Sequence, residues 1–314
     1  MIKESVLITG GAGYIGSVLS EHLLNRGYKV TVLDNLSFGY NSLIHLITNS
    51  NFEFIYGDVR DEKILKKIVP IYDVIIPLAA IVGAPQCDLN PIDAKLINRD
   101  SVILINEIRE KNQKLIYPNT NSGYGTTTGE IYCTEETPLK PISIYGKTKC
   151  EAEEAIVNSK KDYIVLRLAT VFGISPRMRT DLLVNYFVFK AISDGYIVIY
   201  EKDFKRNYIH VKDVARCFEH CILNFDSMKN NIYNVGLDSA NLSKQELAEK
   251  IKEYFPKFDI TYKEINKDPD KRNYIVSNKK LINSGFTCKY DLNYGIEELK
   301  KGYNLIFKKE VFRQ

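Results

Sequence analysis

The stretch Val6-Leu7-Ile8-Thr9-Gly10-Gly11-Ala12-Gly13-Tyr14-Ile15-Gly16 determines the fold that we expect for this chain. Its apolar start is typical of a buried strand, and a helical pattern of apolar residues follows the glycines. Gly11, Gly13 and Gly16 have the spacing of the dinucleotide-binding fingerprint. Without side chains, the backbone can turn sharply and approach a pyrophosphate, which the N-terminus of the following helix attracts. The alternative is a turn with a purely structural role. The expected cofactor contacts in this stretch are Gly10, Gly13, Tyr14, Ile15 and Gly16.

The composition is that of an ordinary water-soluble protein and gives no support to several other classes. The 314 residues are 45% hydrophobic and 26% charged, with a net charge of +4. This small charge, without clustered Lys or Arg, gives no argument for nucleic-acid binding. None of the six cysteines forms a C-x-x-C pair, which argues against a zinc site. No signal peptide precedes the first strand and no apolar run reaches membrane-spanning length, so we expect a cytoplasmic protein that binds no membrane.

A carboxylate ends the second expected strand, at residues 28–34. Asp34 follows the glycines at about the twenty-residue distance at which an acidic residue binds the ribose hydroxyls and repels a 2′-phosphate. The next residues, Asn35, Leu36 and Ser37, include no arginine that would neutralise such a phosphate. We therefore expect NAD rather than NADP, although Asp34 alone could also be a helix cap or a turn residue.

Short apolar strands alternate with helices through the first half of the chain. Further strands are expected at 52–59, 74–80, 114–117 and 163–169, and helices at 62–69 and 92–111. This alternation predicts an α/β protein with a doubly wound parallel sheet of the Rossmann type. Asp58, beside Val59, could accept a hydrogen bond from an adenine amino group or could cap the helix at 62–69. The small residues of Leu78-Ala79-Ala80 would leave room for the dinucleotide.

A tyrosine and a lysine four residues apart indicate acid–base chemistry. Tyr145 and Lys149 share one face of an expected helix, downstream of the polar loop at 117–125. An ammonium group and the positive ring of an oxidised nicotinamide would favour the phenolate, so Tyr145 could accept a proton from an alcohol. Thr120 would hold and polarise that alcohol. A lone Tyr-x-x-x-Lys pair also occurs on ordinary helix surfaces, but the glycine fingerprint and Thr120 favour catalysis here.

The alternation weakens after residue 170, which predicts a smaller second portion. We expect an NAD-binding Rossmann domain at 1–170, to which 211–235 return, and a substrate-binding portion at 171–210 and 236–314. Arg177, Arg179 and Arg206 are candidate diphosphate ligands, because the guanidinium fork matches phosphate oxygens. Each of them could instead form a surface ion pair.

Together these residues resemble the extended short-chain dehydrogenases/reductases, and within them the NAD-dependent nucleotide-sugar epimerase/dehydratase group. The landmarks that match are residues 9–16, Asp34-Asn35-Leu36, Gly57-Asp58-Val59, Leu78-Ala79-Ala80, Asn98, Thr120, Tyr124-Gly125, Tyr145 with Lys149, Leu166-Arg167 and Arg206-Asn207-Tyr208-Ile209-His210-Val211. The resemblance implies that Tyr145 is the catalytic acid or base, that Lys149 binds the nicotinamide ribose, and that Thr120 completes the trio. It also implies a nucleotide-sugar substrate that is oxidised at a hydroxyl, usually the one at C4.

The same resemblance extends the set of expected site residues. The expected cofactor contacts beyond the glycine turn are Asp34, Asn35, Leu36, Ser37, Asp58, Val59, Leu78, Ala79, Ala80, Asn98, Tyr145 and Lys149. The expected substrate contacts are Thr120, Asn121, Ser122, Thr170, Arg177, Arg179, Asn185 and Arg206. No metal is expected.

Three departures from the family pattern narrow the expected chemistry. The 4,6-dehydratases of the family carry Asp-Glu directly after the catalytic Ser or Thr, where this chain has Asn121-Ser122. Neither side chain can act as the acid–base pair, so we do not expect dehydration. Thr170 replaces the usual Asn of the Leu-Arg-x-x-Asn segment, and residues 201–204 replace the usual Gly-Asp-Gly before Arg206.

A narrower resemblance is to the bacterial GDP-heptose 4-dehydrogenases of capsule and surface-polysaccharide biosynthesis. It lies in residues 117–125, 168–179 and 268–274, and it implies oxidation at C4 of a GDP-linked heptose. The alternative is a 4-epimerase similar to UDP-glucose 4-epimerase, which makes the same ketone and returns the hydride to its other face. A cofactor-sensing or RNA-binding protein without catalysis is a third hypothesis, but such a protein should lack the Tyr145 and Lys149 pair.

The family also implies a homodimer. Its subunits usually pack through two helices, which correspond here to residues 92–111 and 145–159. Val102, Ile105 and Ile108 could supply an apolar face for that contact, although they could equally belong to the core.

Overall fold

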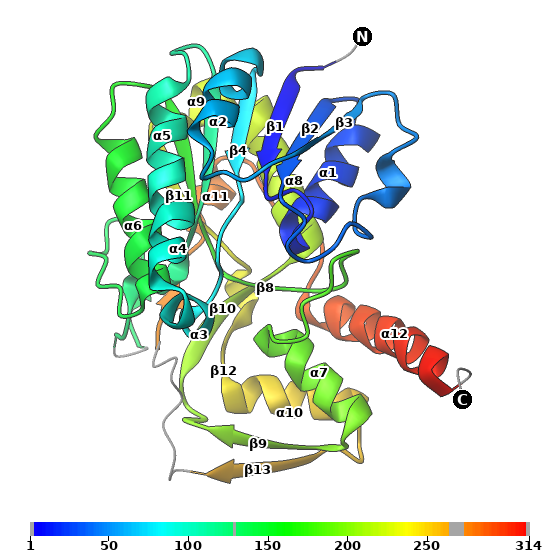
Figure 1. Ribbon diagram of the computed structural model, residues 1–314. Helices are drawn as coiled ribbons and strands as arrows, with labels where there is room; N and C mark the ends of the chain where they lie inside the picture. The colour runs from blue at the N-terminus through cyan, green and yellow to red at the C-terminus, as the bar shows by residue number, and fades with distance from the viewer. Residues whose placement is uncertain (1–2, 128–129, 264–272, 312–314) are drawn as a thin grey trace.

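A seven-stranded parallel sheet forms the centre of the computed structural model, which describes residues 3–127, 130–263 and 273–311. Its strands are β1 (Ser5–Thr9), β2 (Lys29–Asp34), β3 (Phe52–Tyr56), β4 (Val74–Pro77), β5 (Lys114–Thr120), β7 (Tyr163–Leu168) and β11 (Asn231–Val235). They lie in the order β11-β7-β5-β4-β1-β2-β3 (Figure 1). The chain winds outward from β1 in both directions, which confirms the predicted Rossmann-type sheet.

Helices cover both faces of this sheet. The helices of this half are α1 (Tyr14–Asn25), α2 (Glu62–Ile68), α3 (Ala84–Leu89), α4 (Pro91–Lys95), α5 (Ser101–Ile108), α6 (Ile144–Val157), α8 (Val211–Leu223), α9 (Phe225–Met228) and α11 (Lys279–Asn283). Alternate side chains of β1 face opposite sides of the sheet. Val6 and Ile8 pack with α1 and α8, and Leu7 packs with α2, α5 and α6. The strands are apolar on both faces because each face is buried under helices.

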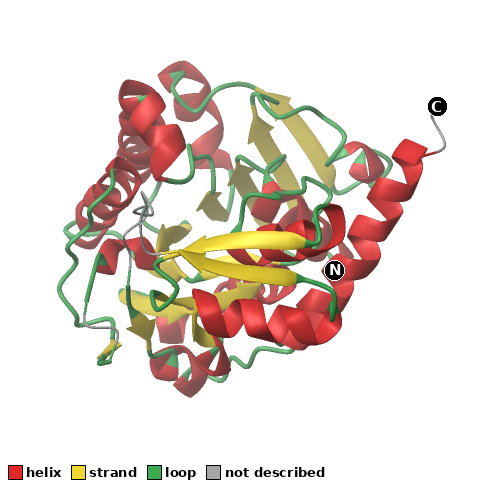
Figure 2. Cartoon of the chain, turned by 90° about the horizontal axis from the view of Figure 1, so that it is seen from below, coloured by secondary structure: helices red, strands yellow, loops and turns green. Residues whose placement is uncertain are grey.

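A second core lies below the sheet in Figure 1. Its elements are α7 (Leu183–Ser193), α10 (Lys244–Tyr254), α12 (Leu292–Val311), β8 (Thr170–Phe172), β9 (Tyr196–Tyr200), β10 (Lys205–His210), β12 (Asn241–Ser243) and β13 (Asp259–Lys263). Strands β8, β10 and β12 form one small sheet. The β9–β13 pair lies nearest the viewer when the molecule is seen from below (Figure 2). Two short strands, β6 (Tyr132–Cys133) and β14 (Ile275–Val276), pair with each other.

The structure differs from the sequence-based expectations in three local features. The helix expected at 92–111 is divided into α4, a π-helical turn at Leu96–Asp100, and α5. Strand β5 continues to Thr120, three residues beyond its predicted end. Asp61, not Asp58, caps α2, because its carboxylate accepts the N–H groups of Lys63 and Ile64.

The structure also bears on the expected apolar face for a dimer, on the cysteines and on membrane-spanning helices. Val102 and Ile105 are buried in the core between the sheet and α5, so they cannot supply an exposed face. The cysteines are free thiols, and Cys217 and Cys221 lie on the buried face of α8, in the core. In the part of the chain that the structure describes, no helix is both long and apolar enough to cross a membrane. Of the resemblance segment 268–274, residues 268–272 lie outside the described residues.

Candidate active site

The glycine turn joins β1 to α1 at the carboxyl edge of the sheet. Gly10 has a φ of +71°, and a Cβ at this position would lie 2.6 Å from Ala79 Cα. A side chain there would therefore push away the segment that follows β4. No side chain of the described residues caps α1, so the N–H groups of Tyr14 and Ile15 in its first turn remain available. This end of α1 fits the pyrophosphate of a dinucleotide.

Two carboxylates lie together at the ends of β2 and β3. Asp34 accepts hydrogen bonds from the N–H groups of Ala12, at 3.0 Å, and Leu36, at 2.8 Å. Burial raises the pKa of Asp34, and the two N–H groups partly offset this effect. Asp58 accepts from Asn35 Nδ2 at 2.9 Å, and hydrogen bonds from Arg60 lower the pKa of Asp58. Because Arg60 is bonded to Asp58 and also to Asp93, its charge is already neutralised. This arrangement suits ribose hydroxyls better than a 2′-phosphate.

Asn98 holds the segment that follows β4. It is completely buried in the π-helical turn, where its side chain accepts from Ile81 N–H at 2.8 Å and donates to Ile81 O at 2.9 Å. It also donates to Thr148 Oγ1 of α6 at 3.4 Å. Both polar ends of Asn98 are thus bonded within the protein. Asn98 thus connects the segment that follows β4 to α6.

Tyr145 and Lys149 lie one turn apart on α6, whose N-terminus is capped by Ser143. Lys149 is almost completely buried, with its Nζ 4.3 Å from the centre of the Tyr117 ring. Burial lowers the pKa of Lys149 to about 7. Tyr117 also donates its hydroxyl to Lys149 O at 3.0 Å, so it fixes the backbone as well as the side chain of the lysine. Tyr145 is half-buried. The predicted pair therefore combines a half-buried phenol with a poorly solvated amine one helical turn further along α6.

Thr120 stands at the end of β5 and begins the turn that contains Asn121 and Ser122. Its Oγ1 donates to Ser122 Oγ at 2.9 Å and accepts from Ser122 N–H at 3.1 Å. The Asn121 amide is completely buried, and neither of its polar atoms has a hydrogen-bond partner among residues 3–127, 130–263 and 273–311. No carboxylate stands at either position, as the sequence indicated.

A buried ion pair supports this end of α6, and the sequence analysis did not identify it. Arg167 of β7 and Glu153 of α6 are both about 5% exposed and lie 2.5 Å apart. Asn119 also donates to Glu153, and Arg167 Nη1 donates to the Tyr124 hydroxyl at 3.1 Å. Glu153 lies one turn after Lys149 on the same helix face, and this spacing was the signal available in the sequence. The pair joins α6 to β7 of the central sheet, one turn after Lys149.

The candidate substrate arginines come from two places. Arg177 and Arg179 lie on the loop between β8 and α7, and Arg206 lies on β10, next to β8. The Arg177 guanidinium stacks over the exposed Phe38 ring at 4.4 Å. Arg206 is buried and donates to Lys205 O at 3.0 Å.

Arg179 is the arginine of this loop that lies toward the tyrosine. It forms a two-bond ion pair with Asp181, at 2.6 and 2.5 Å. Burial would lower the pKa of Arg179, but Asp181 raises it, with smaller contributions from Tyr145 and Tyr14. Arg179 therefore lies within electrostatic range of Tyr145.

The two remaining predicted substrate residues, Asn185 and Thr170, lie on α7 and β8. Asn185 is completely buried in α7, where it is bonded to Gly173 N–H and Arg179 O. Thr170 begins β8 and is half-buried. The described residues contain no group of three or more His, Cys, Asp or Glu side chains that could hold a metal ion.

The fold and this site define a class of protein, a dinucleotide-dependent enzyme with a Rossmann-type sheet. The family model for the NAD dependent epimerase/dehydratase family matches residues 6–236, and the chain belongs to this family. UDP-arabinose 4-epimerase 1 of Arabidopsis thaliana is 30% identical over 307 residues, covering 85% of this chain and 73% of that protein. The cofactor is NAD, as predicted from Asp34.

Solved structures extend the comparison to the whole fold. The UDP-glucose 4-epimerase of Thermotoga maritima, solved with UDP-glucose, has a TM-score of 0.81 and 25% identity, covering 96% of this chain and 99% of its own. The dTDP-glucose 4,6-dehydratase of Bacillus anthracis, in complex with NAD, has a TM-score of 0.83 and 24% identity, covering 96% and 97%. The similar sequences are named UDP-sugar 4-epimerases rather than GDP-heptose dehydrogenases, which favours the epimerase alternative.

Proposed function

We propose that this chain oxidises the C4 hydroxyl of a nucleotide-linked sugar and completes the reaction as a 4-epimerase. The observation that carries the proposal is that Tyr145 and the buried amine of Lys149 lie one turn apart on α6, a helix that packs against the turn following Thr120. NAD would supply the hydride acceptor. The names of the similar sequences support a UDP-linked sugar and a 4-epimerase.

Each residue has a separate task in this proposal. Thr120 binds the C4 hydroxyl through its hydroxyl oxygen, which Ser122 orients. Tyr145 accepts the proton of that hydroxyl as the hydride leaves, and gives a proton back when the hydride returns. Lys149 binds the nicotinamide ribose and favours the phenolate of Tyr145.

The second portion of the chain would hold the nucleotide. We propose the division expected from the sequence, in which 171–210 and 236–314 bind the sugar nucleotide and the remainder binds NAD. Arg179 and Arg206 would neutralise the diphosphate, with Arg179 nearer to the reacting end because of its electrostatic coupling to Tyr145. Asn121 and Ser122, not carboxylates, directly follow Thr120, so dehydration is not proposed.

A second candidate is a 4-dehydrogenase that releases the 4-keto sugar. The observation in its favour is the resemblance of residues 168–179 to the GDP-heptose 4-dehydrogenases, in the loop that carries Arg177 and Arg179. The two candidates share the oxidation step and differ only in whether the ketone is retained until the hydride returns.

One experiment distinguishes them. The purified NAD-loaded enzyme is incubated separately with UDP-arabinose, UDP-glucose and a GDP-heptose, and the products are analysed by NMR and by the absorbance of NADH. We expect the C4 epimer of one UDP-sugar to form without net NADH. Release of a 4-keto sugar, with one NADH formed for each ketone when free NAD is supplied, would instead support the dehydrogenase. No product from any of the three sugars would contradict the proposal.

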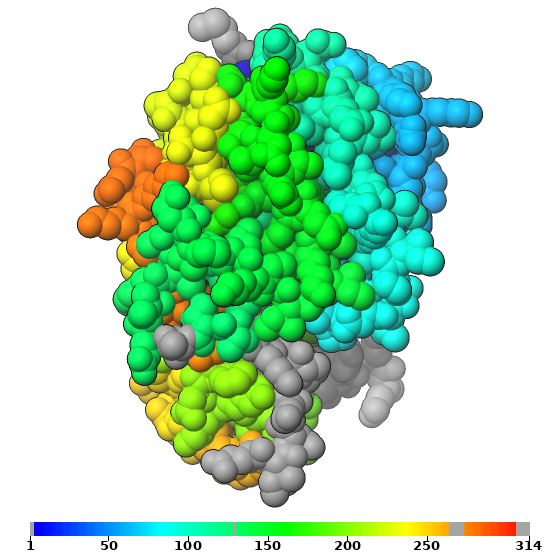
Figure 3. Space-filling view, turned by 90° about the vertical axis from the view of Figure 1, so that its left-hand side faces the viewer, coloured from blue at the N-terminus to red at the C-terminus, as the bar shows by residue number. Residues whose placement is uncertain are grey.

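We also propose a homodimer, packed through the face that α5 and α6 form (teal and green in Figure 3). The expected contact segments, residues 92–111 and 145–159, carry the exposed apolar side chains Ile92, Leu96 and Val157. The face also carries charged groups, including the Arg99–Glu151 ion pair that joins the π-helical turn to α6. Light scattering should give twice the chain mass of 36.0 kDa. A mass of one chain would exclude the dimer.

The thiols support an intracellular location for this reaction. All six cysteines are free in the structure, and most are buried. Free thiols persist in reducing compartments. We therefore propose the cytoplasm.

A further inference from the structure

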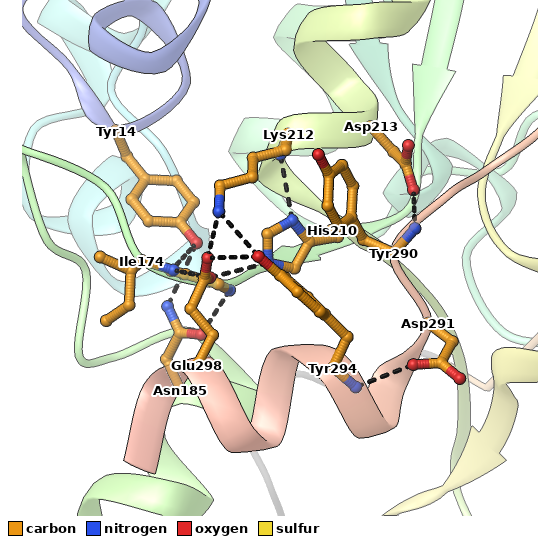
Figure 4. A network of polar contacts seen from close by, with 11 residues as sticks. Tyr14, Ile174, Asn185, His210, Lys212, Asp213, Tyr290, Asp291, Tyr294 and Glu298 are labelled. Atoms are coloured by element: carbon orange, nitrogen blue, oxygen red, sulfur yellow. Dashed lines mark hydrogen bonds and ion pairs between the residues drawn. The ribbon is translucent and has the colours of Figure 1, made fainter. Parts of the chain in front are cut away.

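The backbone at Gly173 and Ile174 is bonded by side chains from three separate helices (Figure 4). Tyr14 of α1 donates its hydroxyl to Gly173 O at 2.7 Å, and Asn185 Oδ1 of α7 accepts Gly173 N–H at 3.0 Å. Glu298 Oε2 of α12 accepts Ile174 N–H at 3.0 Å. Gly173 has a φ of +112°, and a Cβ there would lie 2.4 Å from His210 Nε2, so a side chain cannot fit. The backbone of these two residues is therefore fixed by contacts with α1, α7 and α12.

The carboxylate of Glu298 is itself well fixed. Its Oε2 is bonded to His210 Nε2 at 2.9 Å, and its Oε1 accepts from the Lys212 ammonium (Figure 4). Burial would raise the pKa of Glu298, but the hydrogen bonds from His210, Ile174 and Lys212 lower it to about 2. Glu298 is consequently a charged acceptor at neutral pH, and such acceptors form the stronger hydrogen bonds.

The loop between β8 and α7, which begins at Gly173, carries two of the candidate diphosphate ligands, Arg177 and Arg179. Asn185, which holds Gly173 N–H, also donates to Arg179 O at 2.9 Å, so one side chain fixes both ends of the loop. Ser175 donates to Tyr14 O at 2.7 Å and fixes the middle of the loop to α1. A shift of the Ile174 backbone would therefore move Arg177 and Arg179 together.

We propose that Glu298 is a positioning residue for nucleotide-sugar binding, acting through Ile174 N–H on the loop that carries Arg177 and Arg179. The proposal rests on the function proposed above. Glu298 lies 124 residues after Ile174, on the last helix, so α12 would take part in substrate binding without contacting substrate. The effect should fall on binding rather than on the chemical step, because Tyr145 and Lys149 belong to α6.

The test compares Glu298→Gln with Glu297→Gln. Glu297 is the adjacent, exposed carboxylate on α12, so its variant has the same change in charge. The dissociation constants of UDP and GDP are measured by calorimetry on the NAD-loaded enzyme, together with NAD content, KM and kcat. Glu298→Gln should weaken binding of the nucleotide that the wild type prefers by about tenfold or more, with a parallel rise in KM and little change in kcat. Glu297→Gln should match the wild type.

A double-mutant cycle tests whether Glu298 acts through the loop. If it does, Glu298→Gln should weaken binding in the wild-type background but add little to Arg179→Gln. Independent, additive losses would overturn the proposal, as would a fall in thermal stability with unchanged nucleotide affinity.

Two further outcomes are distinct. If Glu298→Gln does not fold, Glu298→Asp retains the charge but is one methylene too short to bond Ile174 and Lys212 together, and it should show the same loss of affinity. An unchanged affinity in a folded Glu298→Asp would overturn the proposal. A wild-type enzyme that binds neither UDP nor GDP would contradict the proposed function itself, and this inference with it.

Discussion

Replacing Tyr145 with Phe is expected to lower kcat by about a thousandfold or more while NAD remains bound. The variant removes only the hydroxyl that would accept the C4 proton, and general acid–base groups contribute factors of about 10² to 10⁴. The half-buried ring and its packing on α6 are retained, so folding should be unaffected. The measurement is the initial rate of C4 oxidation, with bound NAD quantified after denaturation.

The matched control for this variant is Tyr196→Phe. Tyr196 lies on β9 with more than half of its surface exposed, far in the sequence from α6. It loses the same hydroxyl and should keep the full rate. If Tyr145→Phe retained near-normal turnover, the proposed proton acceptor would be excluded, whereas loss of NAD together with activity would indicate a structural role.

Replacing Lys149 with Met is expected to have two opposite effects. Turnover should fall by about a hundredfold or more, because the amine no longer favours the phenolate or binds the ribose. The cofactor-free protein should nevertheless become more stable at pH 7. Burial lowers the pKa of Lys149 to about 7, and each unit of pKa shift corresponds to about 1.4 kcal/mol. Removing the buried amine should therefore stabilise the fold by a few kcal/mol, on the order of this shift.

The stability gain should depend on pH in a definite direction. An unfolded lysine binds its proton up to a pH of about 10.4, whereas Lys149 in the folded protein releases it near pH 7. Between these values the unfolded state binds more protons, so the wild type gains stability as the pH rises. The difference between Lys149→Met and the wild type should thus be largest at and below pH 7 and should shrink toward pH 10.

Urea denaturation at pH 7, 8 and 9 measures this difference. Lys147→Met is the control, since Lys147 is exposed on the same helix and should show little change at any pH. A Lys149→Met protein that is less stable than the wild type at pH 7 would contradict the prediction. So would a stability difference between the two proteins that stays the same from pH 7 to pH 9.

The features that the sequence predicted correctly are those with local signals. The glycine turn, the strands of the sheet and the position of Asp34 each depend on a few neighbouring residues, and all have the expected place. The pairing of Tyr145 and Lys149 follows from helical spacing alone. Such signals do not require knowledge of what lies across the fold.

The features that the sequence could not predict depend on contacts between distant segments. The sequence suggests Asp58 as a possible cap of α2, but in the structure Asp61 caps this helix and Asp58 is bonded to Asn35 and Arg60. The bonds of the Asn98 side chain to Ile81 likewise have no signal in the sequence, where Asn98 is predicted as a cofactor contact. No local pattern connects Glu298 with Ile174, because a single carboxylate on an amphipathic helix resembles any solvated one.

The late position of β11 in the chain affects how the protein can be made. All six residues of β7 are buried, and one edge of this strand is completed only by β11. While the ribosome synthesises the intervening segment, that edge has unpaired N–H and C=O groups, which are prone to pair with other chains. Newly made protein should therefore depend on rapid completion, or on chaperones, until the last strand of the sheet has emerged.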